Sequence, residues 1–154
     1  MDSRPGWDQY FLNIAKQVAE RSTCLRAKIG AVIVCDKRIL ATGYNGAPSG
    51  IPHCLEVGCF VHETRDPEGL VEQNCLRTIH AEINAIVQAA RHGISIEGAS
   101  IYLTHSPCVN CLKVIINAGI KIVHYGKVYK PYSPFGESLI NLSGIKMETI
   151  QQEC

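Results

Sequence analysis

Long apolar runs, clusters of basic residues and repeats are absent from this sequence. No stretch approaches the roughly 20 consecutive apolar residues that a helix needs to cross a bilayer. The first residues lack the apolar core of a signal peptide, so we expect a cytoplasmic protein without membrane association. The formal net charge is only +1 at pH 7, and no run of Lys or Arg supplies the basic surface with which proteins bind nucleic-acid polymers. We therefore expect a small-molecule substrate.

Cysteine, by contrast, is abundant, with 8 residues in a chain of 154. Without an export signal these thiols are expected to stay reduced, so we interpret them as metal ligands or small apolar residues rather than as disulfides. The 46% hydrophobic and 19% charged residues are values typical of globular proteins. A chain of this length fits a single domain with one hydrophobic core, which we assign to residues 1–154.

The hydrophobic periodicity predicts alternating helices and strands. Helices are predicted at 6–20, 80–92, 108–118 and about 134–143, and strands at 29–34, 39–44, 99–104, 121–125 and about 146–150. The strands on either side of the third helix form a βαβ unit, so they should be parallel, with the site beyond their carboxyl ends. Thr78 and Ser106 are the predicted N-caps of the second and third helices.

Residues 46–77 break this pattern. They contain several glycines and prolines, three cysteines and little periodicity, so we expect an irregular insertion. Structureless segments of this length are uncommon unless they are functional or held in place.

Two short motifs carry the chemistry: His80-x-Glu82 and, further along, Cys108-x-x-Cys111 preceded by proline. The cysteines fall in the first turns of a predicted helix, where free N–H groups stabilise thiolates. Two thiolates and the imidazole leave tetrahedral zinc one open position for water, and Glu82 would be the general acid and base. The cysteine pair alone would also fit a redox pair or half of a zinc knuckle. Together, however, the motifs match the signature of zinc-dependent deaminases.

Further segments along the chain also match zinc-dependent deaminases. These segments are Ser22–Arg26, Gly30–Val34, Gly43–Gly46, His53–Cys54 and Arg77–Ala85. From Trp7 to about Ile150 the chain resembles the deoxycytidylate (dCMP) deaminases of bacteria and phages, within the cytidine-deaminase-like superfamily. The resemblance implies a three-layer α/β/α fold with a five-stranded mixed sheet. It implies hydrolytic deamination of dCMP to dUMP with release of ammonia, which supplies dTMP synthesis. It also implies a homohexamer and control by dCTP and dTTP, with Mg²⁺ accompanying the effector.

The same resemblance supplies candidate substrate contacts. Arg26, and less clearly Lys28, should approach the phosphate, Asn45 should lie beside the sugar and base, and Ala81 is a further candidate. Considered without the resemblance, Asn45 before a glycine is typical of a turn, and Arg26 is typical of a solvated surface charge.

The cysteines left over around the insertion suggest a second zinc site with a structural role. Cys24 and Cys54 match ligands of a second zinc ion in some phage-type relatives. Cys59 and Cys75 are added on the reasoning that an insertion without a core needs a cross-link, and His53 or His62 could replace a cysteine. Uncoordinated thiols and disulfides remain the alternatives.

Two other functions compete with dCMP deamination. A tRNA adenosine deaminase or another nucleobase deaminase shares the His-x-Glu and Cys-x-x-Cys motifs, although the near-neutral charge disfavours it. A zinc-stabilised nucleic-acid-binding module is the alternative outside enzymes, but it leaves Glu82 without a role.

Overall fold

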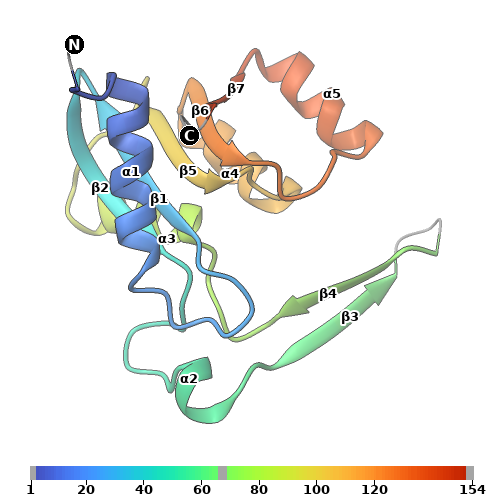
Figure 1. The fold of residues 1–154 in the computed structure, drawn as a ribbon. Coiled ribbons are helices and arrows are strands. Elements are labelled where there is room, and N and C mark those ends of the chain that lie inside the picture. Colours follow the sequence, from blue (N-terminus) through green and yellow to red (C-terminus); the bar gives the residue numbers. More distant parts are fainter. Residues whose placement is uncertain (1–2, 66–68, 152–154) are drawn as a thin grey trace.

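The computed structural model describes residues 3–65 and 69–151, and it contains a five-stranded mixed sheet between helices (Figure 1). The order across the sheet is β2-β1-β5-β6-β7. The strands are β1 (Gly30–Cys35), β2 (Arg38–Tyr44), β5 (Ser100–His105), β6 (Ile122–Lys127) and β7 (Lys146–Thr149). β1 pairs antiparallel with β2 and β5, whereas β5, β6 and β7 are parallel. The predicted strands and the parallel βαβ unit are therefore confirmed.

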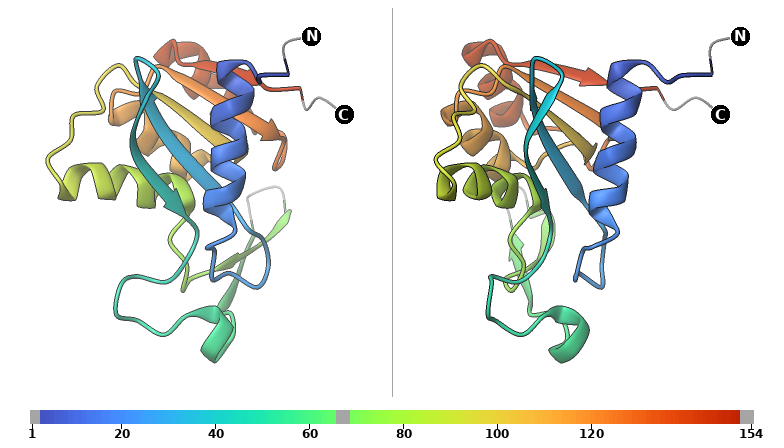
Figure 2. Two further views of the ribbon diagram at one scale, coloured as in Figure 1. Left: turned by 60° about the vertical axis from the view of Figure 1, so that its left-hand side comes forward. Right: turned by 90° about the vertical axis from the view of Figure 1, so that its left-hand side faces the viewer.

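Helices cover both faces of this sheet, which confirms the three-layer fold (Figure 2). Helix α1 (Trp7–Ala19) packs on one face. The other face carries α3 (Ala81–Arg91), α4 (Val109–Asn117) and α5 (Pro134–Ser143). Within the described residues, no helix combines the length and hydrophobicity that crossing a membrane requires.

Strand β1 is the centre of the core because both of its faces are buried. Ala31 and Ile33 point into the cluster beneath α3 and α4, whereas Val32 and Val34 point into the cluster beneath α1. This is why β1 appears in the sequence as a continuous apolar run rather than as an alternating one.

A glycine on β2 lets α3 lie unusually close to the sheet. A Cβ atom at Gly43 would stand 2.3 Å from the carbonyl oxygen of Ala81 and 2.4 Å from the backbone nitrogen of Ala85. Only a residue without a side chain allows this approach. The close contact fixes the first turn of α3 against the sheet.

The segment predicted to be irregular is ordered in part, which corrects the expectation for residues 46–77. It contains the short helix α2 (Cys54–Val57) and an antiparallel hairpin of β3 (Val61–Arg65) and β4 (Val71–Cys75). We call this hairpin the arm, because it extends away from the main sheet (Figure 1). Its strands are mostly polar and exposed, so they show neither the alternation nor the apolar runs that predict strands.

Candidate active site

The first motif lies at the start of α3, which brings His80 and Glu82 to one point. His80 is the N-cap residue with extended backbone angles, and Glu82 follows in the first turn with only 4% of its surface exposed. Two backbone hydrogen bonds between Gly46 and Ile79, with N–O distances of 3.2 and 2.8 Å, fix the chain where it enters the helix. Both motif residues therefore reach the same pocket from an opening turn, as expected.

The second motif lies at the start of α4. Cys108 is the N-cap residue, and its Sγ accepts a hydrogen bond from the backbone N–H of Cys111 at 3.5 Å. Cys111 is buried one turn further on. The N–H groups of this first turn have no partners within the helix, so they favour negative charge on the sulfur atoms.

Both predicted N-caps are wrong, because the N-cap residue of each helix lies two positions later and is the motif residue itself, His80 in α3 and Cys108 in α4. The Thr78 hydroxyl instead donates to the carbonyl oxygen of Cys75 at 3.5 Å. The Ser106 hydroxyl accepts a hydrogen bond from the backbone N–H of Tyr129 at 2.8 Å. These two side chains hold loops around the pocket rather than helix ends.

His80, Cys108 and Cys111 form a group that we call the active-site cluster. Their ligand atoms lie within 4.8 Å of one another, and the His80 Nδ1 is 3.6 Å from the Cys108 Sγ and 3.3 Å from the Cys111 Sγ. Tetrahedral zinc, with Zn–S near 2.3 Å and Zn–N near 2.0 Å, places N and S ligands about 3.5 Å apart. The three side chains therefore fit a zinc ion and leave one coordination position open.

The pKa values in this cluster follow from burial and close contacts. Burial raises the pKa of the Glu82 carboxyl to about 7. The contact with the Cys111 thiol lowers the pKa of Cys108 to about 4, and the same contact together with burial raises the pKa of Cys111. The hydrogen bond with Cys108 raises the pKa of His80. The cluster thus holds a thiolate beside a carboxyl that can both accept and donate a proton near neutral pH.

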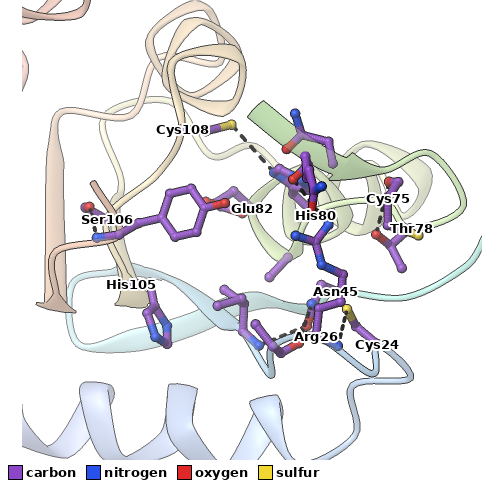
Figure 3. Close-up of a pocket in the computed structure, with 16 residues that line it drawn as sticks. Cys24, Arg26, Asn45, Cys75, Thr78, His80, Glu82, His105, Ser106 and Cys108 are labelled. Carbon is purple, nitrogen blue, oxygen red and sulfur yellow. Dashed lines mark hydrogen bonds between the residues drawn. The ribbon is translucent and has the colours of Figure 1, made fainter. Parts of the chain in front are cut away.

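A cavity of about 220 Å³ opens over the active-site cluster (Figure 3). Its walls come from the loop before β1, the ends of β2 and β4, and the segment after β5. Besides His80 and Cys108 of the active-site cluster, the site residues proposed from the sequence that reach it are Cys24, Arg26, Asn45, Cys75, Ala81 and Glu82. Lys28 is not among the residues that line this cavity; its Nζ forms an exposed ion pair with Glu20 at 3.1 Å.

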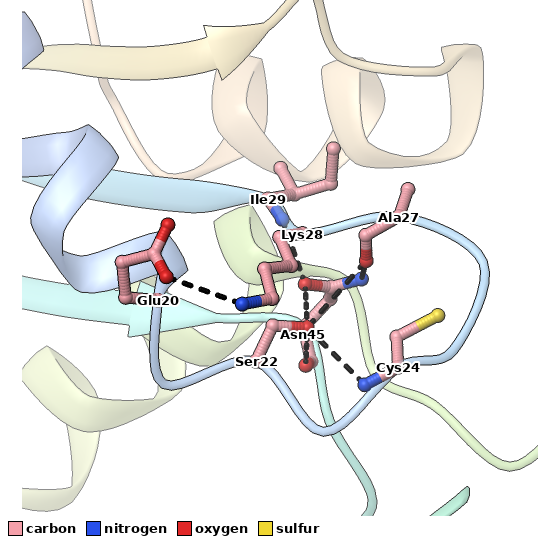
Figure 4. A network of polar contacts seen from close by, with 7 residues as sticks. All are labelled: Glu20, Ser22, Cys24, Ala27, Lys28, Ile29 and Asn45. Atoms are coloured by element: carbon pink, nitrogen blue, oxygen red, sulfur yellow. Dashed lines mark hydrogen bonds and ion pairs between the residues drawn. The ribbon is translucent and has the colours of Figure 1, made fainter. Parts of the chain in front are cut away.

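Asn45 lines the cavity, yet most of its hydrogen-bonding capacity is used by the protein (Figure 4). Its Oδ1 accepts hydrogen bonds from the Ser22 hydroxyl at 2.6 Å and from the Ile29 backbone N–H at 2.9 Å. Its Nδ2 donates to the carbonyl oxygen of Ala27 at 2.8 Å. Asn45 therefore shapes the loop that carries Arg26, and one N–H of its amide is left for a ligand.

A second group of thiols lies at the base of the arm, and we call it the arm cluster. The Sγ atoms of Cys54, Cys59 and Cys75 lie within 4.8 Å of one another, and the Cys54–Cys75 distance is 3.7 Å. Two sulfur ligands of tetrahedral zinc stand about 3.8 Å apart, so this group also fits a metal ion. Burial raises the pKa of Cys54 to about 12. Burial also opposes ionisation of Cys75, but backbone hydrogen bonds outweigh it and lower its pKa to about 7.

Cys24 is not part of the arm cluster, so the predicted set of four cysteines is not assembled among the described residues. Its Sγ accepts a hydrogen bond from the backbone N–H of Arg26 at 3.3 Å, and it lines the active-site cavity instead. Disulfides are absent from the described part of the chain.

Gln73 and Asn74 are the polar residues of the cavity wall for which sequence reasoning gave no expectation. Both belong to β4 of the arm, and the Gln73 carbonyl oxygen accepts a hydrogen bond from the Arg26 Nη1 at 3.2 Å. No motif marks these residues in the sequence, because they reach the pocket only through the fold of the arm. His105 and Tyr129, which lie after β5 and β6, also line the cavity, and burial lowers the pKa of His105.

Comparisons with known proteins agree with this site. Residues 5–127 match the family model described as the cytidine and deoxycytidylate deaminase zinc-binding region. The chain is 43% identical to ComE operon protein 2 of Bacillus subtilis over 96% of its own length and 73% of that protein. It is 41% identical to the deoxycytidylate deaminase of Mycobacterium phage D29, over 81% of this chain and 98% of the phage enzyme.

A solved structure shows the same architecture. The dCMP deaminase of the cyanophage S-TIM5, in complex with dCMP and dUMP, superposes with a TM-score of 0.74 at 32% sequence identity. The match covers 96% of this chain and 98% of the phage enzyme. The chain therefore belongs to the family of cytidine and deoxycytidylate deaminases, which bind zinc through this region.

Proposed function

We propose that this chain catalyses the zinc-dependent hydrolytic deamination of dCMP to dUMP, with release of ammonia. The observation that carries the proposal is the buried Glu82 at the wall of a cavity that it shares with the active-site cluster. A structural zinc site would have no use for a buried carboxyl at this position. The names of several relatives, which are deoxycytidylate deaminases, support the choice of substrate.

His80, Cys108 and Cys111 would hold the zinc ion, which when bound makes a water molecule acidic enough to lose a proton near neutral pH. The Glu82 carboxylate would accept that proton. It would pass this proton to the ring nitrogen N3 of cytosine, then take the second proton of the former water oxygen and pass it to the departing amino group. Burial supports both tasks, because it raises the pKa of Glu82 to about 7, close to the pH at which the proton must be taken up and released.

Arg26, Asn45 and Ala81 would hold the rest of the nucleotide. The Arg26 guanidinium is suited to a phosphate, and the remaining amide N–H of Asn45 to the sugar or base. Ala81 is the first residue of α3, so its backbone N–H has no partner within the helix and can donate to the carbonyl oxygen of the base. The Arg26 side chain points from its loop into the cavity (Figure 3).

A substrate panel tests the proposal. Initial rates on dCMP, CMP and deoxycytidine are measured with the zinc-loaded protein, from the change in ultraviolet absorbance as cytosine becomes uracil. We expect dCMP to be the best substrate. A zinc-loaded protein that leaves the dCMP spectrum unchanged would refute the activity, and faster turnover of deoxycytidine than of dCMP would refute the role of Arg26.

We further propose that the arm cluster binds a second, structural zinc ion. Cys54, Cys59 and Cys75 supply three ligands, and His53 or His62 would supply the fourth. The spacing of the sulfur atoms and the lowered pKa of Cys75 support this assignment, because zinc binds thiolates. Metal analysis of the purified protein should find two zinc ions per chain, and a value of one would contradict the second site.

The resemblance to dCMP deaminases extends the proposal to regulation and assembly, with dCTP and Mg²⁺ as activators, dTTP as inhibitor and a homohexamer as the active form. A second cavity of about 570 Å³ between β2 and α3, with the Arg91 guanidinium and the His92 imidazole at its wall, offers space and polar groups for a nucleotide. Rates on dCMP with and without dCTP plus Mg²⁺ or dTTP test the control. Sedimentation analysis tests the hexamer.

A further inference from the structure

One wall of the active-site cavity is built by the arm rather than by the main fold. Gln73, Asn74 and Cys75 of β4 line the cavity. Among the described strands, β3 and β4 pair with each other and not with the five-stranded sheet. The pocket therefore has a rigid side, made by helix ends on the sheet, and a second side whose position depends on how the arm is held.

Arg26, on the loop before β1, carries the only guanidinium or ammonium group among the described residues of the cavity wall, and the arm binds this group. Its Nη1 donates to the Gln73 carbonyl oxygen at 3.2 Å. Because guanidinium has five N–H donors, this bond orients the group and leaves other donors for an anion. The backbone of the arm thus sets where positive charge lies in the cavity.

Asn74, the next residue of β4, brings a second donor to the same wall. It is partly buried, and its side-chain amide makes no hydrogen bond to another residue in the described parts of the chain. The side-chain amide offers two N–H donors and, although it is neutral, can donate a hydrogen bond to a phosphate oxygen. Its position next to Gln73 places it close to the group that Gln73 holds.

The one acidic residue on β4 does not work against this arrangement. Glu72 would repel a phosphate, but its carboxylate forms an ion pair with the Lys130 ammonium. Lys130 follows Tyr129, which lines the cavity. The pair neutralises the charge and ties the arm to the loop after β6, so that β4 is held by Arg26 and by Lys130.

From these contacts we infer that the arm makes the site selective for a nucleoside monophosphate over a nucleoside. Asn74 is the specificity residue that binds the phosphate together with Arg26, and the Gln73 carbonyl is a positioning group for Arg26. This inference rests on the proposed function, because it assigns the phosphate of the same substrate.

Kinetics of two Asn74 variants on dCMP and deoxycytidine test the inference. In Asn74→Ala the loss of one hydrogen bond to the phosphate should raise KM for dCMP about tenfold, with little change in kcat. Deoxycytidine has no phosphate, so its kcat/KM should stay unchanged. Asn74→Asp keeps the shape of the side chain but adds a negative charge, so KM for dCMP should rise further, again without an effect on deoxycytidine.

Direct binding of the products, measured by calorimetry, gives a readout that does not depend on turnover. Binding of dUMP should weaken in both variants, whereas binding of deoxyuridine should not. Thr64→Ala on the exposed partner strand β3 is the matched control and should leave both substrates unaffected.

Equal losses on dCMP and deoxycytidine would show that Asn74 only shapes the pocket, and an unchanged KM for dCMP would show that it does not reach the phosphate. Either result overturns the inference. If the wild-type protein fails to deaminate dCMP, the proposed function falls instead, and the comparison of dUMP with deoxyuridine still decides the role of Asn74.

Discussion

The active-site cluster and the arm cluster are held in place by different parts of the fold. The active-site cluster lies at the N-terminal ends of α3 and α4, which pack on the same face of the sheet over the larger part of the hydrophobic core. The arm cluster joins a helix of four residues to the base of an exposed hairpin. A hairpin of two strands is marginally stable by itself. The hydrophobic core therefore places the ligands of the first cluster, whereas the second cluster has to supply order to a segment that lacks a core.

The largest effect on activity is expected from substitution of Glu82, the buried residue proposed to transfer protons. Glu82→Gln keeps the size of the side chain but removes its ability to move protons, so kcat on dCMP should fall about 10⁴-fold or more, since the residue serves more than one proton transfer. Zinc content and dUMP binding should remain. A variant with full rate would show that the buried carboxyl is not the general acid and base.

Loss of one cysteine from each cluster separates their roles. Cys111→Ser should lose the catalytic zinc and at least about a thousandfold in activity, because the metal activates the water. Cys59→Ser should lose the other zinc ion but keep most of its kcat, with a higher KM for dCMP because the cavity wall formed by β4 is loosened.

Zinc content and kinetics of both variants are measured side by side, with Cys35→Ser as the control, since Cys35 ends β1 and belongs to neither cluster. If Cys59→Ser retained two zinc ions per chain, the arm cluster would not be the site of the second zinc ion.

Removal of metal should affect the two regions differently. After chelation, the amides of α3 and α4 should keep their protection from hydrogen exchange, because the core holds these helices. The amides of β3 and β4 should lose most of theirs, because local opening follows the loss of cross-links where few apolar contacts exist. Exchange measured by mass spectrometry before and after re-addition of zinc checks this. Equal loss in both regions would show that the whole fold depends on metal.

The same contrast decides what could be predicted from the sequence. The helices and strands followed from periodicity, because α1 and β1 bury regular apolar patterns, whereas the three layers were implied by the resemblance to dCMP deaminases. The active-site cluster followed from the two motifs, because their residues are close in sequence and lie at helix starts. The N-caps of these two helices were misplaced by two residues, since Thr78 and Ser106 hold loops instead.

The arm could not be predicted in this way. β3 is exposed along its whole length and β4 over its first three residues, so nothing in their pattern distinguishes them from a loop. The role of Gln73 at the cavity wall depends on its backbone carbonyl, which any residue would provide. Cys24 was assigned to the arm cluster because it matches relatives that bind a second zinc, but its position is fixed by the loop that Asn45 and Ser22 hold.

The smallest effect is expected at the ion pair that ties the arm to the loop after β6. Glu72 and Lys130 are 51% and 44% exposed, and exposed pairs contribute about 0–1 kcal/mol. Glu72→Gln should therefore raise KM for dCMP by no more than about fivefold, and the difference from wild type should shrink at high ionic strength because salt screens the pair. KM measured at low and high salt checks this. An effect as large as that of Asn74→Ala would mean that the ion pair holds this wall of the cavity more firmly than the hydrogen bond of Arg26 does, whereas an effect that salt does not reduce would mean that Glu72 does not act through its charge.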